Sequence, residues 1–166
     1  MGLLLPVWHW SRSKMLKLHN SYSNNVEEFR PDSNSVKVYL CGPTVQSSPH
    51  IGHGRSAVVF DFLIRYLKFS NYQVTFVRNI TDIEDKIIQR SEEEGITTEE
   101  LADRVTKEFQ KSYADLNCLL PNHEPKATDT IDHIIYLIEL LIDKGYAYST
   151  KSGVYFEVGK FENYLN

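Results

Sequence analysis

The stretch VKVYLCGPTVQSSPHIGHGR, residues 36–55, joins the pattern of a strand to the start of a helix. Its first apolar residues alternate with Lys37 and Tyr39, which is the two-residue period of a strand, and we expect that strand to end at Cys41. The Gly-Pro pair that follows turns the chain, and Pro49 stands just ahead of the next regular element. The stretch therefore predicts a strand, a loop and a helix in that order.

Residues 53–69 are expected to form this helix, because apolar side chains recur there every three or four positions. These side chains are Val58, Val59, Phe62, Leu63, Tyr66 and Leu67. The segment QVTFV, residues 73–77, has the composition of a second strand. A strand, a helix and a strand within about forty residues form a βαβ unit, whose two strands are parallel.

Two capping boxes come next. Thr81 with Glu84 is expected to begin a helix that Gly95 ends, and Thr97 with Glu100 is expected to begin another. The apolar residues of the second helix are Leu101, Val105, Phe109 and Tyr113.

The last third of the sequence predicts a helix and a hairpin. IDHIIYLIELLIDKG, residues 131–145, has the pattern of a strongly apolar helix closed at Gly145. YAYST and GVYFEV then form an expected hairpin that turns at residues 151–153. A doubly wound nucleotide-binding sheet needs more parallel strands than the two found, so we expect the domain to continue beyond this sequence. Residues 1–14 are expected to be a disordered extension or the result of an early start, because MLKLHN at Met15 is a more natural beginning.

Composition limits the classes of function. The 166 residues are 42% hydrophobic and 24% charged, which fits one globular domain with a core. A net charge of −4 excludes an overall basic field that would attract nucleic acid. Cys41 and Cys118 do not make a disulfide framework, which favours a reducing cytosol. No apolar run is long enough to cross a membrane, so we expect a cytoplasmic protein without membrane contact.

The loop from Cys41 to His53 is expected to hold the functional site. In an open α/β sheet, ligands bind beyond the carboxyl ends of the strands, where this loop lies. His50 and His53 would both face that crevice from a helix N-terminus, whose free N–H groups suit a phosphate. Gly52 would let a base or a phosphate approach the backbone. No Gly-Lys-Ser/Thr follows, so the loop is not of the Walker type.

Simpler interpretations of the same residues stay open at this point. An H-x-x-H pair is more often two histidines at a helix end than a site. Cys41, His50 and His53 have the ligand types of a zinc site, although a fourth ligand is not obvious. Cys118 follows an apolar helix and is expected to be a small buried hydrophobe.

Three motifs carry a family resemblance. CGPTV (residues 41–45), HIGH (residues 50–53) and NITDIEDK (residues 79–86) together resemble the amino-terminal part of the cysteinyl-tRNA synthetases, which are class I aminoacyl-tRNA synthetases. The similarity extends from Met15 almost to Asn166, through segments such as KATDTIDHIIYLIELLIDKGYAY. HIGH alone is moderately specific, whereas the three motifs together are highly specific.

The resemblance implies a Rossmann-like (HUP-type) α/β fold, of which residues 15–166 form the first half with a helical and hairpin insertion. It implies ATP-dependent activation of cysteine and its transfer to tRNA(Cys), with Mg²⁺ accompanying ATP and a zinc ion in the site. In the family, further zinc ligands, a KMSKS loop and a tRNA-binding region follow, and they are not in this sequence. We therefore expect this chain by itself to be inactive.

The resemblance also implies roles for individual residues. His50 and His53 would be catalytic, as donors to phosphate oxygens while the carboxylate of cysteine attacks the α-phosphate. That carboxylate is ionised at neutral pH, so no general base is needed. Cys41 would be one zinc ligand and would help select cysteine over serine, because zinc prefers thiolate to hydroxyl. The implied ATP-binding residues are Pro43, Thr44, His50, Ile51, Gly52 and His53, and the implied cysteine-binding residues are Cys41, Gly42, Thr44 and Thr81.

Three alternatives belong to other classes. A small nucleotidyltransferase of the pantetheine-phosphate adenylyltransferase type shares an H-x-G-H motif, but it has no use for Cys41 or for NITDIEDK. A cysteine ligase of mycothiol synthesis shares the Cys41 type of site and differs beyond Asn166. A truncated, non-catalytic paralogue that binds a nucleotide or a partner is the third.

Overall fold

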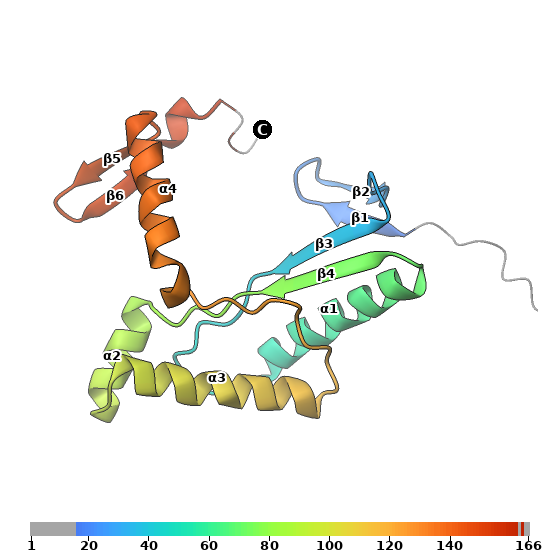
Figure 1. Cartoon of the computed structure of the whole chain (residues 1–166), viewed down its shortest axis with the longest axis horizontal. Helices are drawn as coiled ribbons and strands as arrows, with labels where there is room; N and C mark the ends of the chain where they lie inside the picture. Colours follow the sequence, from blue (N-terminus) through green and yellow to red (C-terminus); the bar gives the residue numbers. More distant parts are fainter. Residues whose placement is uncertain (1–15, 163, 165–166) are drawn as a thin grey trace, which may run out of the picture.

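The computed structural model describes residues 16–162 and Tyr164 (Figure 1). The expectation about residues 1–14 therefore lies outside the described residues. The elements are β1 (Lys17–Asn20), β2 (Asn25–Glu28), β3 (Ser35–Leu40), α1 (Ile51–Phe69), β4 (Gln73–Arg78), α2 (Asp85–Glu94), α3 (Thr98–Asp115), η1 (Thr128–Thr130), α4 (Ile131–Asp143), β5 (Ala147–Thr150), β6 (Gly153–Phe156) and η2 (Val158–Lys160). The antiparallel β1–β2 hairpin falls in a polar stretch where no strand was predicted.

The β3–α1–β4 unit confirms the predicted parallel pair. Val36 lies opposite Val74 and Leu40 lies opposite Arg78, in parallel register. The strand ends at Leu40, one residue before the expected Cys41, and α1 begins at Ile51, two residues before the expected His53. The helix starts early because His50, in extended backbone conformation, caps it.

A third extended segment, residues 122–127, runs parallel to β4 along its other edge. The Arg78 N–H donates to the His123 carbonyl over 3.1 Å, and the Ile80 N–H donates to the Pro125 carbonyl over 2.9 Å. The prediction found only two parallel strands, because PNHEPK has neither a two-residue period nor β-forming residues. Backbone hydrogen bonds hold this segment against β4 without that pattern.

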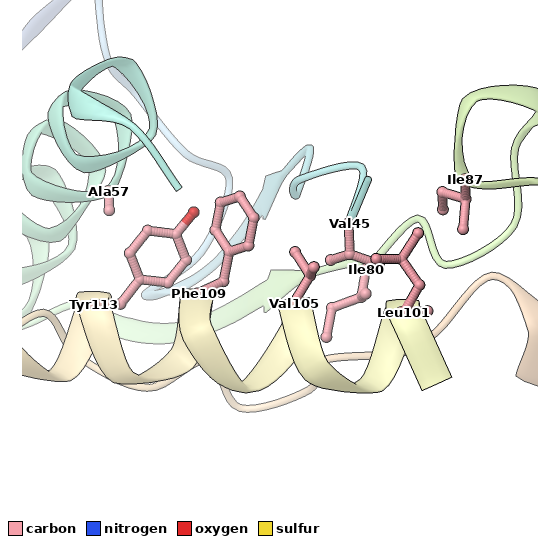
Figure 2. Packing of buried hydrophobic residues seen from close by; sticks show 9 residues of the cluster. Val45, Ala57, Ile80, Ile87, Leu101, Val105, Phe109 and Tyr113 are labelled. Carbon is pink, nitrogen blue, oxygen red and sulfur yellow. The ribbon is translucent and has the colours of Figure 1, made fainter. Parts of the chain in front are cut away.

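Two clusters form the core on the side of the sheet where α1 and α3 lie (Figure 1). The larger one joins the loop after β3, α1, the segment just after β4, α2 and α3 (Figure 2). Its members are Val45, Ala57, Ile80, Ile87, Leu101, Ala102, Val105, Phe109 and Tyr113. The smaller one packs α1 onto the sheet through Leu40, Ile64 and Phe76. The predicted apolar stripe of α3 is therefore a core stripe, and it brings α3 beside the start of α1.

The two predicted capping boxes have different outcomes. Thr97 and Glu100 form the predicted box at the start of α3, with the Glu100 N–H donating to Thr97 Oγ1 over 3.1 Å. The prediction for Thr81 and Glu84 was wrong, because α2 begins at Asp85 and Glu84 occupies the capping position without a side-chain bond. Thr81 is instead drawn into an extension of the sheet, where its N–H donates to the Pro43 carbonyl over 3.0 Å.

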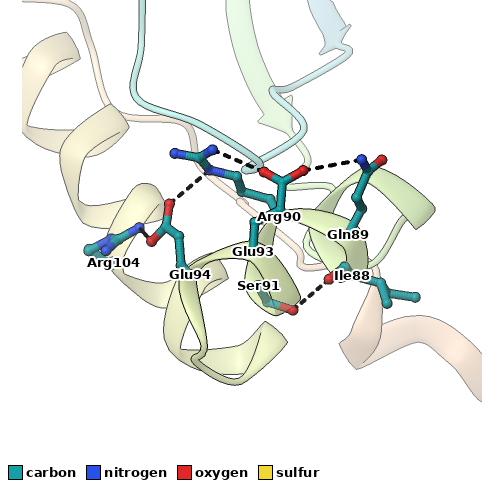
Figure 3. Close-up of polar contacts among 7 residues, drawn as sticks. All are labelled: Ile88, Gln89, Arg90, Ser91, Glu93, Glu94 and Arg104. Atoms are coloured by element: carbon teal, nitrogen blue, oxygen red, sulfur yellow. Dashed lines mark hydrogen bonds and ion pairs between the residues drawn. The ribbon is translucent and has the colours of Figure 1, made fainter.

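Glycines end two helices as predicted. Gly95 follows α2 with φ 67° and Gly145 follows α4 with φ 74°, both in the left-handed region. One ion pair links α2 to α3 across the first of these turns, where Arg104 contacts Glu94 at 2.6 Å (Figure 3). Within α2, Arg90 contacts the same Glu94 at 2.8 Å. Such exposed pairs contribute little to the free energy of unfolding, and the two helices also share the larger core cluster described above.

The predicted helix and hairpin after residue 130 are confirmed, and in Figure 1 they project away from the β3–β4 sheet. β5 and β6 are antiparallel, and Lys151 and Ser152 form the turn between them. Although α4 is almost continuously apolar, none of its residues is buried. Across residues 16–162, no helix combines the length and apolar character needed to span a membrane.

Candidate functional site

A cavity of about 290 Å³ opens where β3 ends. The loop after β3 forms one side of it, the first turns of α1 form another, and the end of β4 and the helix α3 complete it. The lining residues are Leu40, Cys41, Gly42, Pro43, Thr44, Gln46, Ser47, His50, His53, Ser56, Ala57, Arg78 and Tyr113. The cavity therefore lies where sequence reasoning placed the site, at the carboxyl ends of parallel strands.

Most of the residues predicted for the site meet in this cavity. Cys41, Gly42, Pro43 and Thr44 line it together with His50 and His53. The remaining three, Ile51, Gly52 and Thr81, are not among its lining residues. Thr81 lies next to the wall, since the Val45 N–H donates to its carbonyl over 3.1 Å and residues 44 and 81 form a parallel bridge.

The side chains of His50 and His53 both accept capping hydrogen bonds from backbone N–H groups at the start of α1. The Gly52 N–H donates to His50 Nδ1 over 3.1 Å, and the His50 N–H donates to His53 Nδ1 over 3.2 Å. The two ring centroids are 3.9 Å apart. Because each Nδ1 accepts a hydrogen bond, a neutral imidazole here carries its proton on Nε2. Both histidines are thus set up as Nε2–H donors.

This capping corrects one expectation about the helix N-terminus. Its N–H groups were expected to be free for a phosphate, but the Gly52 N–H is taken by His50 Nδ1. The N–H groups of His53 and Gly54 donate to the His50 carbonyl over 2.9 Å and 3.3 Å. The donors that this turn offers to a ligand are therefore mainly imidazole groups.

The pKa of His53 is lowered, first by partial burial and second by the proximity of His50. Burial disfavours the charged imidazolium, and a positive charge on the neighbouring ring disfavours it further. His53 is therefore predominantly neutral at neutral pH, which the hydrogen bond accepted by its Nδ1 requires.

Two glycines allow this arrangement. A Cβ on Gly52 would lie 2.8 Å from His50 Cε1, so any side chain there would push the ring out of its capping position. A Cβ on Gly42 would lie 1.6 Å from the Asn79 carbonyl oxygen, and the Gly42 N–H donates to Asn79 Oδ1 over 2.8 Å. The close contact between Gly42 and Asn79 thus holds the segment after β3 against the segment after β4. In this structure Gly52 makes room for His50.

The described residues do not complete a metal site. Cys41 is an exposed free thiol. Within residues 16–162 and at Tyr164, no group of three or more His, Cys, Asp or Glu side chains has a metal-binding arrangement. Among the described residues, Cys41, His50 and His53 are thus not brought together as a set of zinc ligands.

Among the lining residues that sequence reasoning missed, Arg78 and Tyr113 come from elements far from the loop in sequence. The Arg78 side chain is 4% exposed, bonds to Glu124 through Nε at 3.0 Å and Nη2 at 2.6 Å, and lies 4.3 Å over the Tyr113 ring. Burial raises the pKa of the Tyr113 hydroxyl, and the Arg78 charge partly opposes this. A charged residue in an apolar strand was a usable signal for Arg78. Tyr113 could not be found, because its place in the apolar period of α3 is also that of a core residue.

The sequence profile described as tRNA synthetases class I (C) catalytic domain matches residues 28–166. The chain belongs to this family. The match begins at Glu28, the last residue of β2, and covers all later elements and the cavity. It agrees with the resemblance carried by the three motifs.

Individual members of the family are similar over nearly the whole chain. The cysteine–tRNA ligase of Pseudomonas syringae pv. syringae is 48% identical over 152 residues, which is 90% of this chain and 33% of that protein. The cysteine–tRNA ligase of Methanococcus maripaludis (strain C7) is 49% identical over 151 residues, or 90% of this chain and 32% of the relative. That of Francisella philomiragia is 47% identical over 148 residues. The chain spans about a third of the length of these curated relatives.

Proposed function

We propose that this chain carries the first part of the active site of a cysteine–tRNA ligase, which activates cysteine with ATP and transfers it to tRNA(Cys). The observation that supports this most is the cavity in which Cys41 and both histidines of the HIGH motif meet at the end of a parallel strand. We propose further that residues 15–166 belong to a Rossmann-like, HUP-type catalytic domain, for which β3–α1–β4 is the nucleating βαβ unit. The proposed location is the cytoplasm.

The proposed first step joins the carboxylate of cysteine to the α-phosphate of ATP and releases pyrophosphate. The attacking carboxylate is already ionised, so the chain has to position two anions and stabilise the charge that builds on phosphate oxygens. His50 and His53 supply neutral Nε2–H donors for those oxygens, held by their own capping bonds. ATP, with Mg²⁺, is proposed to contact Pro43, Thr44, Ile51 and Gly52 as well as the two histidines. The amino acid is proposed to contact Cys41, Gly42, Thr44 and Thr81.

A larger hollow, of about 460 Å³, lies between α2 and α3 and is less suited to a nucleotide. Asp82, Glu84, Glu99, Asp103 and Asp129 line it, with Lys126 as its single basic residue. A triphosphate would meet repulsion from most of these carboxylates. The acidic lining of the larger hollow therefore favours the cavity at the HIGH motif as the nucleotide-binding site.

Zinc enters this proposal only through Cys41, as one ligand of an ion whose other ligands lie outside the described residues. A single thiolate does not hold a tetrahedral zinc ion, so no step of the reaction is assigned to the metal.

A chimera tests the proposal. Residues 16–166 of this chain replace the matching third of the Pseudomonas syringae relative, and cysteine-dependent exchange between ATP and pyrophosphate is measured. We expect exchange in the chimera and none in this chain alone. His53→Gln and His50→Asn should each reduce kcat by about two to three orders of magnitude, with a much smaller change in KM.

These substitutions separate the effect of losing the imidazole donor from the effect of losing the helix cap. Asn is a good N-cap and Gln at the third helical position can complete a capping box, so both variants retain the start of α1. With the amide oxygen in the capping bond, the amide N–H no longer occupies the position of the imidazole Nε2–H. His133→Ala, on the exposed face of α4, is the control and should retain full exchange. An inactive chimera, or full exchange in His53→Gln, would contradict the proposal.

A further inference from the structure

Phe109 of α3 contacts one of the two proposed catalytic histidines. Its ring centroid is 4.8 Å from that of His53, and the two ring planes are at 79°. Phe109 is 2% exposed and belongs to the larger core cluster, whereas His53 is only partly buried at the cavity wall. This contact joins a core residue of one element to a site residue of another.

Two independent contacts fix the His53 ring. The His50 N–H donates to Nδ1 over 3.2 Å, which sets the tautomer but leaves the ring free to tilt about that bond. An edge-to-face contact with Phe109 restricts this tilt, because the attraction between the rings depends on their relative orientation. Together they restrict the direction in which Nε2 points.

Phe109 is itself supported from the sheet. Tyr113 lies one turn further along α3, with its ring centroid 5.8 Å from that of Phe109. Arg78, at the end of β4, lies 4.3 Å over the Tyr113 ring and is held by Glu124. The contacts Arg78–Tyr113–Phe109–His53 therefore connect β4 to the start of α1 through α3. Besides His53, the titratable or charged residues that line the cavity are Cys41, His50, Arg78 and Tyr113.

We infer that Phe109 is a positioning residue for His53. Through this contact, α3 would support the proposed reaction by restricting the orientation of the imidazole. The role in the reaction rests on the proposed function, whereas the ring contact does not. Phe109 does not line the cavity, so it acts on the site through its ring contacts with the lining residues His53 and Tyr113.

Nuclear magnetic resonance on this chain tests the contact without any activity. In the unsubstituted chain we expect nuclear Overhauser effects between the ring protons of His53 and Phe109. Phe109→Leu should remove the ring-current shift of the His53 protons and bring the pKa of His53 closer to its ordinary value, since the ring that buries it is lost. Phe76→Leu is the matched control, because Phe76 is also a buried phenylalanine but belongs to the smaller cluster. It should leave the His53 resonances unchanged.

Kinetics in the chimera test the consequence. Phe109→Leu should lower kcat for exchange by about tenfold to a hundredfold while KM changes less than about threefold, as expected for a misaligned donor. Phe76→Leu should change neither by more than about threefold. The inference is overturned if the Overhauser effects are absent in the unsubstituted chain, which needs no variant to fold. It is also overturned if the chimera with Phe109→Leu retains its kcat. An inactive parent chimera with the ring contact present would refute the proposed function and leave the contact standing.

Discussion

α3 and α4 are both α-helices with apolar residues at helical spacing, but they differ in how much of their surface is buried. α3, TEELADRVTKEFQKSYAD, mixes charges with apolar residues and buries Leu101, Ala102, Val105, Thr106, Phe109 and Tyr113. α4, IDHIIYLIELLID, is far more apolar and buries none of its residues. The difference comes from their neighbours: α3 faces α1, α2 and the loop after β3, whereas α4 has the β5–β6 hairpin and η1 beside it.

The region after residue 130 is held together by aromatic contacts instead of a closed core. Tyr146 contacts Phe156 and Phe161, with ring centroids 6.5 Å and 6.0 Å apart. Tyr148 and Tyr155 stack across the hairpin at 5.9 Å. Apolar periodicity thus identifies a helix in both regions, but only the packing partners decide how much of it is buried. Three predictions test this contrast, in order of decreasing effect.

The largest effect is expected from a matched pair of leucines. Leu101 in α3 is 0% exposed and Leu137 in α4 is 54% exposed. Leu101→Ala should lower the free energy of unfolding by about 2–5 kcal/mol, because it leaves a cavity in a closed cluster. Leu137→Ala should change it by less than about 0.5 kcal/mol. Urea denaturation followed by circular dichroism measures both, and equal losses would mean that α4 is as well packed as α3.

A smaller effect is expected at the start of α3. Thr97→Ala removes the oxygen that accepts the Glu100 N–H and should lower the free energy of unfolding by about 1 kcal/mol. Thr98→Ala is the control, since Thr98 is exposed and is the first residue of α3, next to the capping residue Thr97. It should be neutral or slightly stabilising in the same assay. If both variants lose the same amount, the capping box is not what starts α3.

The smallest effect is a pH dependence that comes from His53. Its pKa is lowered in the folded chain, so the unfolded chain binds more protons once the pH falls below about 6.5. The contribution of His53 to stability is therefore fully present above about pH 6.5 and is lost as the pH falls through the folded pKa.

His53→Gln should reduce the slope of unfolding free energy against pH in this window. Gln can keep the capping bond to the His50 N–H, so the comparison with the parent isolates the ionisation. Urea denaturation at a series of pH values from about 7.5 to about 5.5 provides the measurement. Unchanged slopes would show that the burial of His53 by α3 has no electrostatic consequence.

The sequence alone determined the features that depend on residues close together in the chain. The two-residue period before Cys41 and the apolar spacing after His53 predicted β3 and α1, and the parallel pairing with β4 followed from their order. The capping box at Thr97, the glycines at 95 and 145 and the β5–β6 hairpin are equally local. The loop motif predicted that Cys41, His50 and His53 share one site, since few residues separate them.

Only the tertiary structure decided the features that depend on distant partners. Residues 122–127 extend along β4 mainly through backbone hydrogen bonds, which do not require a strand pattern of side chains, so their composition carried no sign of it. Thr81 had the spacing of a helix cap, but its backbone is engaged by the loop at Pro43 instead. Phe109 and Tyr113 had the period of core residues, and nothing in that period shows that they face His53 and Arg78. Periodicity and capping express the conformational preferences of residues that are neighbours in sequence. Burial and side-chain orientation depend instead on which surfaces pack together in the folded chain.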